Sequence, residues 1–249
     1  NGNTRILQFP EANLATGGAA TVAIMQSSLT NNDSITHASA KTFHNPTDIA
    51  IDSTGNVWIS EWTHHRVLKF DTSNQKFGGA ATVALGQSDL TSDTLGNTAT
   101  TLRETAGIDF DSSGNLWVVD RGGHRILKYP AANLATGGAA TVVLGQTDFT
   151  SKSSGTTATK FLDLRSLEFD SDGNLWVADK NNLRIVMFPE ANLVTGGAAT
   201  LVLGQPDFTS KTSNTAANGG LAATSLDTVT GLAFDSSGDL WVVDDGNHR

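Results

Sequence analysis

Three acidic residues hold the most asymmetric chemistry that the sequence offers. Asp109 and Glu168 stand at one position of a repeated segment in which the other two copies have alanine, and Asp48 lies two residues before that position in its own copy. If these side chains line one channel, their carboxylates converge there. Carboxylate oxygens are ligands for Ca²⁺ or Mg²⁺, although the nearby Arg103 and Arg165 could neutralise them instead. We expect no required cofactor and keep a Ca²⁺ site at Asp48, Asp109 and Glu168 as the alternative.

A second candidate site lies where each long connector enters the next repeat. An apolar residue stands there in every copy, namely Phe43, Leu102, Leu162 and Leu226. The residues that follow are His44, Arg103, Asp163 and Asp227. A metal-dependent lyase would need histidine ligands and a general base at such a channel mouth. One histidine with two acids supplies only part of that set. We therefore expect no enzyme, and we keep a metal-dependent lyase or hydrolase as an alternative.

An acid followed five residues later by an arginine recurs in every copy. The pairs are Glu61 and Arg66, Asp120 and Arg125, Asp179 and Arg184, and Asp244 and Arg249. A guanidinium fork can bind both a carboxylate and backbone carbonyls across a turn. Because four equivalent sites make poor catalysts, this pattern predicts a structural clamp at a hairpin.

One hairpin tip differs from the others. Trp62 stands where the other copies have charged residues, and His64 and His65 lie beside it. An aromatic side chain with two imidazoles nearby is typical of a contact patch. The alternative is that Trp62 folds back over its own blade.

These residues all belong to a tandem repeat, whose detection comes before any other assignment. The segments headed by Trp58, Trp117, Trp176 and Trp241 are nearly identical, as in FDSSGNLWVVD and FDSDGNLWVAD. In the second copy we predict strands at 107–111, 116–120, 125–129 and 139–145. A Gly-containing turn at 112–115 joins the first two strands. Pro130 ends the third strand and starts a single helical turn at 130–134.

The strands are apolar on both faces, which fits a sheet packed between two other sheets. Four antiparallel strands per repeat, repeated several times, are the signature of a propeller. The pattern G-[IL]-x-F-D-S-x-G-N-L-W-V-x-D-x-x-x-x-R-I resembles the NHL repeat in every copy. This resemblance implies the fold and leaves the function open, since NHL-like propellers include binding domains, zinc-using lyases and antibiotic-cleaving lyases. Such propellers usually carry five or six blades of about forty residues, and these repeats are longer.

The phase of the repeats predicts how the fold closes. Arg5 stands in the same phase as Arg66, and the arginine positions span one circuit of four repeats with a five-residue overlap. We predict an all-β, four-bladed propeller of four-stranded antiparallel blades, with the last blade shared between N- and C-terminal strands. It forms a single domain, 1–249, with repeat units of about 5–65, 66–124, 125–183 and 184–249. The overlap also suits one period of a repeating polymer.

Composition narrows the partners and the location. The net charge is −9 and no basic run is present, which argues against nucleic acid. The chain has no cysteine and no apolar run long enough for a membrane span. The abundance of Gly, Ala, Thr, Ser and Asn is common in extracellular or cell-surface proteins. The connectors of about twenty residues carry few charges, which suits subunit contacts.

Taken together, the repetition predicts a non-enzymatic extracellular structural module that self-associates, and one period of a self-assembling repeat polymer or filament is one form that it could take. A propeller that binds a protein or a glycan is the alternative. Repetition favours the structural prediction because it supplies identical surfaces, whereas catalysis needs an asymmetric site.

Overall fold

The computed structural model describes residues 5–30, 37–214, 220 and 222–249, and it contains three complete blades of four antiparallel strands. The first blade consists of β3 (Pro46–Ile51), β4 (Val57–Glu61), β5 (Arg66–Phe70) and β6 (Val83–Leu85). The second consists of β7 (Thr105–Phe110), β8 (Leu116–Asp120), β9 (Arg125–Tyr129) and β10 (Val142–Leu144). The third consists of β11 (Leu164–Phe169), β12 (Leu175–Asp179), β13 (Arg184–Phe188) and β14 (Leu201–Leu203).

A fourth blade is present as two halves. β15 (Val229–Phe234) pairs with β16 (Leu240–Asp244), and these are the first two strands of a repeat. β1 (Ile6–Gln8) pairs with β2 (Val22–Ile24), and these are the last two. The all-β propeller of four-stranded antiparallel blades is therefore confirmed, with the strands of the fourth blade divided between the two ends of the chain. Within the described residues, however, β1 pairs only with β2 and β16 only with β15.

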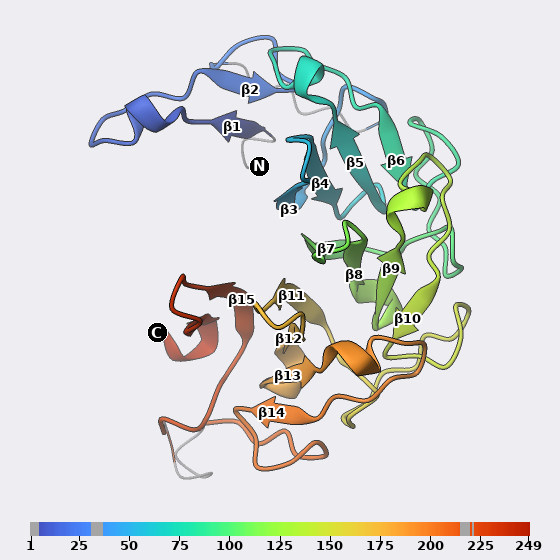
Figure 1. Ribbon diagram of the computed structural model, residues 1–249, viewed down its shortest axis with the longest axis vertical. Coiled ribbons are helices and arrows are strands. Elements are labelled where there is room, and N and C mark those ends of the chain that lie inside the picture. The colour runs from blue at the N-terminus through green and yellow to red at the C-terminus, as the bar shows by residue number, and fades with distance from the viewer. Residues whose placement is uncertain (1–4, 31–36, 215–219, 221) are drawn as a thin grey trace.

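The blades form an open arc, with β1 and β2 at one end and β15 and β16 at the other (Figure 1). One aromatic contact recurs between successive blades. A tryptophan of each blade packs edge-on against a phenylalanine of the next, with ring centroids 5.8–6.0 Å apart. These pairs are Trp58–Phe110, Trp117–Phe169 and Trp176–Phe234. The same aromatic contact therefore recurs at all three interfaces between successive blades.

Short 3-10 turns connect the strands at two recurring places. Those after the third strand are η1 (Glu11–Asn13), η2 (Thr72–Asn74), η4 (Ala131–Asn133) and η6 (Glu190–Asn192). Those after the second strand are η3 (Arg121–Gly123), η5 (Lys180–Asn182) and η8 (Asp245–Asn247). The turn after Pro130 is the helical turn predicted from the sequence. None of the helices in the described ranges is long and apolar enough to cross a membrane.

An aspartate closes the first hairpin of each repeat. Asp111 Oδ1 accepts the backbone N–H groups of Ser113 and Asn115 at 3.0 Å, and its Oδ2 accepts the indole Nε1–H of Trp117 at 3.0 Å. The equivalent indole bonds join Trp58 to Asp52, Trp176 to Asp170 and Trp241 to Asp235. The tryptophan is thus held by a hydrogen bond at its polar end and by aromatic packing along its ring.

Each acid–arginine pair ties a hairpin to the long connectors. Arg125 Nε donates to Asp120 Oδ2 at 2.7 Å, and Nη2 donates to the carbonyls of Thr98 and Thr101 at 3.0 and 3.1 Å. Nη1 donates to the carbonyl of Phe149 in the next connector. Both partners of the pair are fully buried. Arg66 and Arg184 make the same set of bonds in their blades.

Tyr129 offers a direct test of blade packing. Its hydroxyl is fully buried without a hydrogen-bond partner, and burial raises the pKa of this phenol well above its ordinary value. The equivalent residues of the other complete blades are Phe70 and Phe188. An unsatisfied buried hydroxyl costs about 1–3 kcal/mol. We therefore expect Tyr129→Phe to raise the free energy of unfolding in guanidinium by about 1 kcal/mol, and Phe188→Tyr to lower it; a less stable Tyr129→Phe variant would refute this packing.

Candidate functional site

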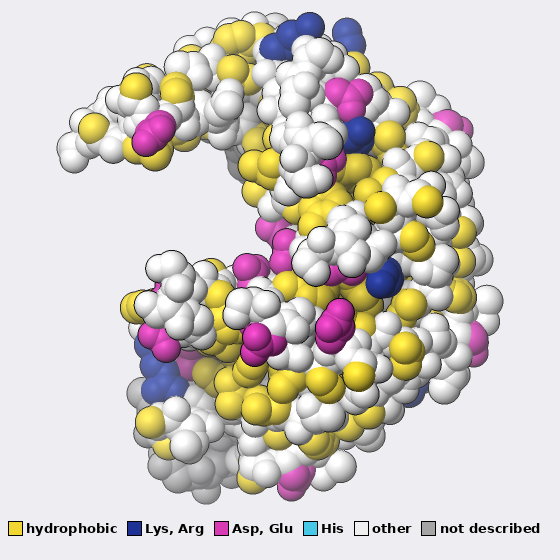
Figure 2. Space-filling model, in the orientation of Figure 1, with side chains coloured by type: hydrophobic (Ala, Val, Ile, Leu, Met, Phe, Trp, Pro, Cys, Tyr) yellow, Lys and Arg dark blue, Asp and Glu magenta, His cyan; other side chains and the backbone are white. Residues whose placement is uncertain are grey.

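The innermost strand of each blade faces the hollow side of the arc. β3, β7 and β11 lie side by side there, each as the first strand of its sheet. They carry Asp48, Asp109 and Glu168, respectively. Acidic side chains gather on this inner wall (Figure 2). The wall therefore presents three carboxylates from three successive blades.

Two of these carboxylates are fixed by the backbone of the next blade. Asp48 Oδ2 accepts the N–H of Ile108 at 2.9 Å, and Asp109 Oδ2 accepts the N–H of Phe169 at 3.3 Å. Each aspartate also accepts the N–H of the residue that follows it, at 2.9 and 2.7 Å. These bonds stabilise the charged form, but burial outweighs them and raises the pKa of both aspartates. Asp48 and Asp109 thus act as fixed negative neighbours on the wall.

Glu168 differs from the two aspartates in its hydrogen bonding. No hydrogen bond to its carboxylate is found among the described residues. Burial raises its pKa to about 7, and the negative charges of Asp109 and Asp48 add to the effect. A carboxyl group with this pKa exchanges its proton near neutral pH, which suits general acid–base chemistry.

This shift predicts a pH dependence of stability. Glu168 binds its proton more tightly in the folded chain (pKa about 7) than at the ordinary value of 4.5. Its stabilising contribution is complete below about pH 4.5 and is lost as the pH rises through 7. We expect the free energy of unfolding of the wild type, relative to Glu168→Gln, to fall between pH 4.5 and 7.5. Parallel curves for the two proteins would show that the carboxyl has an ordinary pKa.

The Ca²⁺ site considered for Asp48, Asp109 and Glu168 can be compared with the positions of these side chains. No group of three or more His, Asp or Glu side chains within the described ranges is placed to hold a metal ion. Neutralisation by Arg165 is not observed either, since its Nη2 donates to Asp163 at 3.3 Å.

The structure changes the alignment of the channel-mouth residues in the third repeat. The clamp acid of each repeat accepts one backbone N–H at this position, and the four donors are His44, Arg103, Leu162 and Asp227. Asp163 therefore stands one residue later than the sequence comparison placed it, because Phe161, and not Leu162, is the equivalent of Leu102. It is bound by Arg121, Arg165 and Lys180, which overcome the effect of burial and lower its pKa. An aspartate held in this way is a poor base.

The predicted contact patch is mostly occupied by internal contacts. The guanidinium carbon of Arg121 lies 4.8 Å from the ring centroid of Trp62, so the tryptophan packs against the next blade. His64 is only 2% exposed and its Nδ1 lies 2.6 Å from Glu61 Oε1, which removes it from the surface patch. His65 Nδ1 accepts the N–H of Glu104 at 3.0 Å, and burial lowers its pKa. Trp62 and His65 therefore contact the second blade, whereas His64 is buried within its own blade.

Sequence reasoning missed the buried glutamines that order the long connectors. Gln205 Nε2 donates to the carbonyl of Thr212 at 3.1 Å, and its Oε1 accepts the Thr212 N–H at 2.8 Å. Gln87 and Gln146 hold their own connectors through equivalent bonds. The sequence does contain a signal for them, because in each of these three repeats a glutamine directly follows the Leu-Gly pair at the end of the fourth strand.

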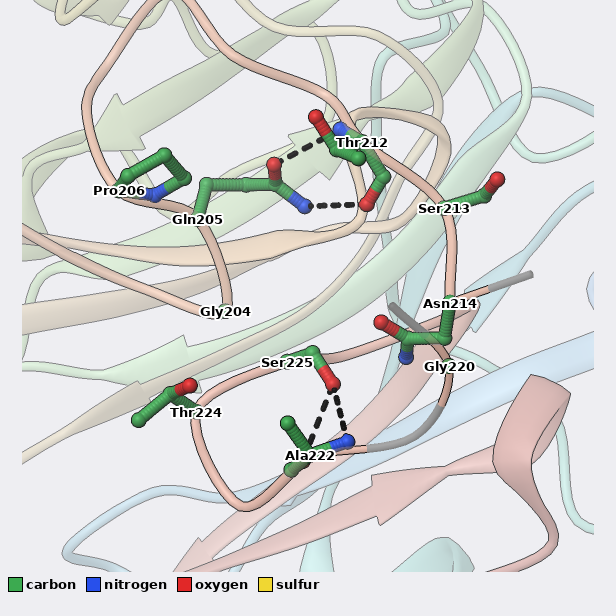
Figure 3. Close-up of a pocket in the computed structure, with 10 residues that line it drawn as sticks. All are labelled: Gly204, Gln205, Pro206, Thr212, Ser213, Asn214, Gly220, Ala222, Thr224 and Ser225. Atoms are coloured by element: carbon green, nitrogen blue, oxygen red, sulfur yellow. Dashed lines mark hydrogen bonds between the residues drawn. The ribbon is translucent and has the colours of Figure 1, made fainter. Parts of the chain in front are cut away.

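A separate hollow of about 350 Å³ lies in the last connector (Figure 3). It is lined by Gly204, Gln205, Pro206, Thr212, Ser213, Asn214, Gly220, Ala222, Thr224 and Ser225. All of these side chains are uncharged, so the hollow lacks an acid or base. We therefore place the candidate site on the inner wall.

Comparison with known proteins agrees with this fold. The NHL repeat model matches residues 43–70, and no curated protein matches the chain. Virginiamycin B lyase from Staphylococcus aureus is similar, with 17% identity, a TM-score of 0.52, and coverage of 97% of this chain and 64% of that one. A gluconolactonase from Xanthomonas campestris has 15% identity, a TM-score of 0.52, and coverage of 98% and 64%. The chain is an NHL-repeat-like β-propeller.

Two consequences follow from these similarities. The chain spans only 53–64% of the length of the first similar structures.

The expectation of a non-enzymatic structural module, and of no enzyme activity, is also corrected, because the similar propellers include a lyase and a gluconolactonase. Repetition did not argue against catalysis after all. A single exchange of alanine for aspartate or glutamate on an inner strand makes an otherwise repeated wall asymmetric.

Proposed function

We propose that the protein is a hydrolase that cleaves an ester-type bond in a neutral or cationic small molecule, with Glu168 as its general base. One observation carries this proposal, namely that Glu168 lies on the inner wall beside two fixed aspartates with its pKa raised to about 7. A base with this pKa is half-ionised at physiological pH and still basic enough to take a proton from water.

The proposed step follows from the arrangement of the three carboxylates. Ionised Glu168 accepts a proton from a water molecule while the water oxygen forms a bond to the ester carbonyl carbon. The bond from this carbon to the leaving oxygen then breaks, and the proton passes from Glu168 to that oxygen. Asp48 and Asp109 keep Glu168 basic through their charge, and they disfavour anionic substrates for the same reason.

The fold is compatible with this class of reaction. The gluconolactonase with a similar fold is named for cleavage of a lactone, and a lactone is a cyclic ester. At 15% identity this similarity concerns the fold, so the choice of substrate rests on the inner wall.

A substrate panel tests the proposal. Neutral lactones and linear esters, each with an anionic and a cationic analogue of similar size, are incubated with the protein, and acid release is followed at constant pH. We expect turnover proportional to protein concentration, with the anionic analogues slowest. Absence of turnover across the panel, or a preference for anions, would contradict the proposal.

A further inference from the structure

The inner edge of each blade carries a backbone N–H group at one recurring position, the last residue of the first strand. The four residues at this position are Ile51, Phe110, Phe169 and Phe234. In the second blade, the residue after Phe110 donates its N–H to Asn115 across the hairpin. Because N–H groups alternate in direction along an antiparallel strand, the Phe110 N–H points away from β8, toward the free inner edge of the sheet.

One carboxylate caps two of these four N–H groups. Asp109 Oδ1 accepts the N–H of Phe110 at 2.7 Å, and its Oδ2 accepts the N–H of Phe169 in the next blade at 3.3 Å. Asp48 caps the residue that follows it and one N–H of the next blade in the same way. An aspartate on an inner strand therefore occupies a donor of its own blade and a donor of the following blade.

The Phe234 N–H has neither kind of cap. Phe234 has the same register in its hairpin as Phe110 has in its own, so its N–H also points to the free inner edge. The residue before it is Ala233, whose methyl group cannot accept a hydrogen bond. The position of Asp109 is taken by Glu168 in the preceding blade. No acceptor for the Phe234 N–H is found in the part of the chain that the structure describes.

The repeat geometry places the Glu168 carboxyl close to this N–H. β11 and β15 contact each other as β7 and β11 do. The ring pairs Trp117–Phe169 and Trp176–Phe234 show that the two interfaces are alike, with centroids 5.9 and 5.8 Å apart, respectively. At the first interface an aspartate reaches the N–H of the next blade. Glutamate is one methylene longer, so its carboxyl extends past the equivalent N–H and leaves that donor free.

We propose that the Phe234 N–H binds the carbonyl oxygen of a neutral ester, lactone or amide beside Glu168. This inference rests on the proposed function, in which water adds to an ester carbonyl. As the water oxygen bonds to the carbonyl carbon, Glu168 takes the proton and the π electrons of the carbonyl move to its oxygen. The Phe234 N–H donates to this oxygen, and the bond strengthens as the negative charge develops. The hairpin holds the donor in place before the reaction begins.

Restoring the missing cap tests the proposal. Ala233→Asp should place a carboxylate on the Phe234 N–H, as Asp109 does on Phe110. We expect it to lower kcat for a neutral ester by about 10²- to 10³-fold, the usual loss for one oxyanion donor. Ala233→Leu has a similar branched shape without an acceptor and should retain the rate. Ala233 is exposed, so both variants should fold, which circular dichroism can verify. Equal rates in the two variants would overturn the proposal.

The amide signal of Phe234 gives a second readout that needs no turnover. δ-Valerolactam is a neutral cyclic amide that presents the carbonyl of a lactone. In the wild type we expect it to move the NMR signal of the Phe234 N–H, whereas the capped N–H of Phe169 stays in place. Ala233→Asp should bind this lactam about tenfold more weakly, the worth of one hydrogen bond.

The two readouts separate this inference from the proposed hydrolysis. A Phe234 signal that the lactam does not move would overturn the carbonyl site, even in a protein that cleaves esters through Glu168. A signal that moves in a protein without esterase activity would support the carbonyl site and refute the hydrolase proposal alone.

Discussion

Glu168→Gln is expected to lower the rate of ester cleavage at pH 8 by about 10²- to 10⁴-fold, the usual contribution of a general base. Glutamine keeps the size of the side chain and removes its ability to accept a proton. Substrate binding should change little, since Asp48 and Asp109 keep the inner wall acidic. The loss should therefore appear in kcat rather than in KM.

The pH profile separates this role from a structural one. The wild-type rate should rise with pH through a midpoint at about 7, where Glu168 becomes ionised. Asp109→Asn removes one of the charges that raise this pKa, so the midpoint should move to lower pH. Glu190→Gln is a control on an exposed turn and should leave rate and midpoint unchanged. An unaltered rate in Glu168→Gln would exclude Glu168 as the base.

Arg125→Ala is expected to lower the free energy of unfolding by about 3–5 kcal/mol. The substitution leaves the fully buried Asp120 without its charged partner and frees the carbonyls of two connectors. Chemical unfolding followed by tryptophan fluorescence measures the loss.

Arg249→Ala provides the matched control for the clamp. It removes the same type of pair, but the Arg249 side chain is 35% exposed, so water can solvate Asp244 in its place. We expect a loss of about 1 kcal/mol or less. Equal losses for Arg125→Ala and Arg249→Ala would show that burial does not determine the strength of the clamp.

Local structure could be predicted from the sequence because its causes are local. The strands at 116–120 and 125–129 were found from their apolar pattern and the turn residues between them, and β8 and β9 have these bounds. The helical turn after Pro130 follows from its fixed φ angle. The shared fourth blade was predicted from the phase of Arg5.

The open arc and the site depend on contacts between blades, which the repeat pattern does not encode. The angle between blades is set by edge-on pairs such as Trp117–Phe169, and a period of about sixty residues carries no information about it. The pKa of Glu168 depends on Asp48, which is two blades away. The inner acids could be found as exceptions to the repeat, but their mutual effect requires the arc. Asp163 was misplaced because two apolar residues, Phe161 and Leu162, are adjacent there, and Phe161 is the equivalent of Leu102.

Direct titration of the Glu168 side chain tests the central claim most directly, because it requires no substrate. The carboxyl carbon of Glu168 can be assigned by NMR through the signal lost in Glu168→Gln, and its chemical shift followed from pH 3 to 9. A midpoint at about 7, moving lower in Asp109→Asn, is the predicted result. A midpoint near the ordinary 4.5 that Asp109→Asn leaves unchanged would contradict the account of the inner wall as an acid–base site.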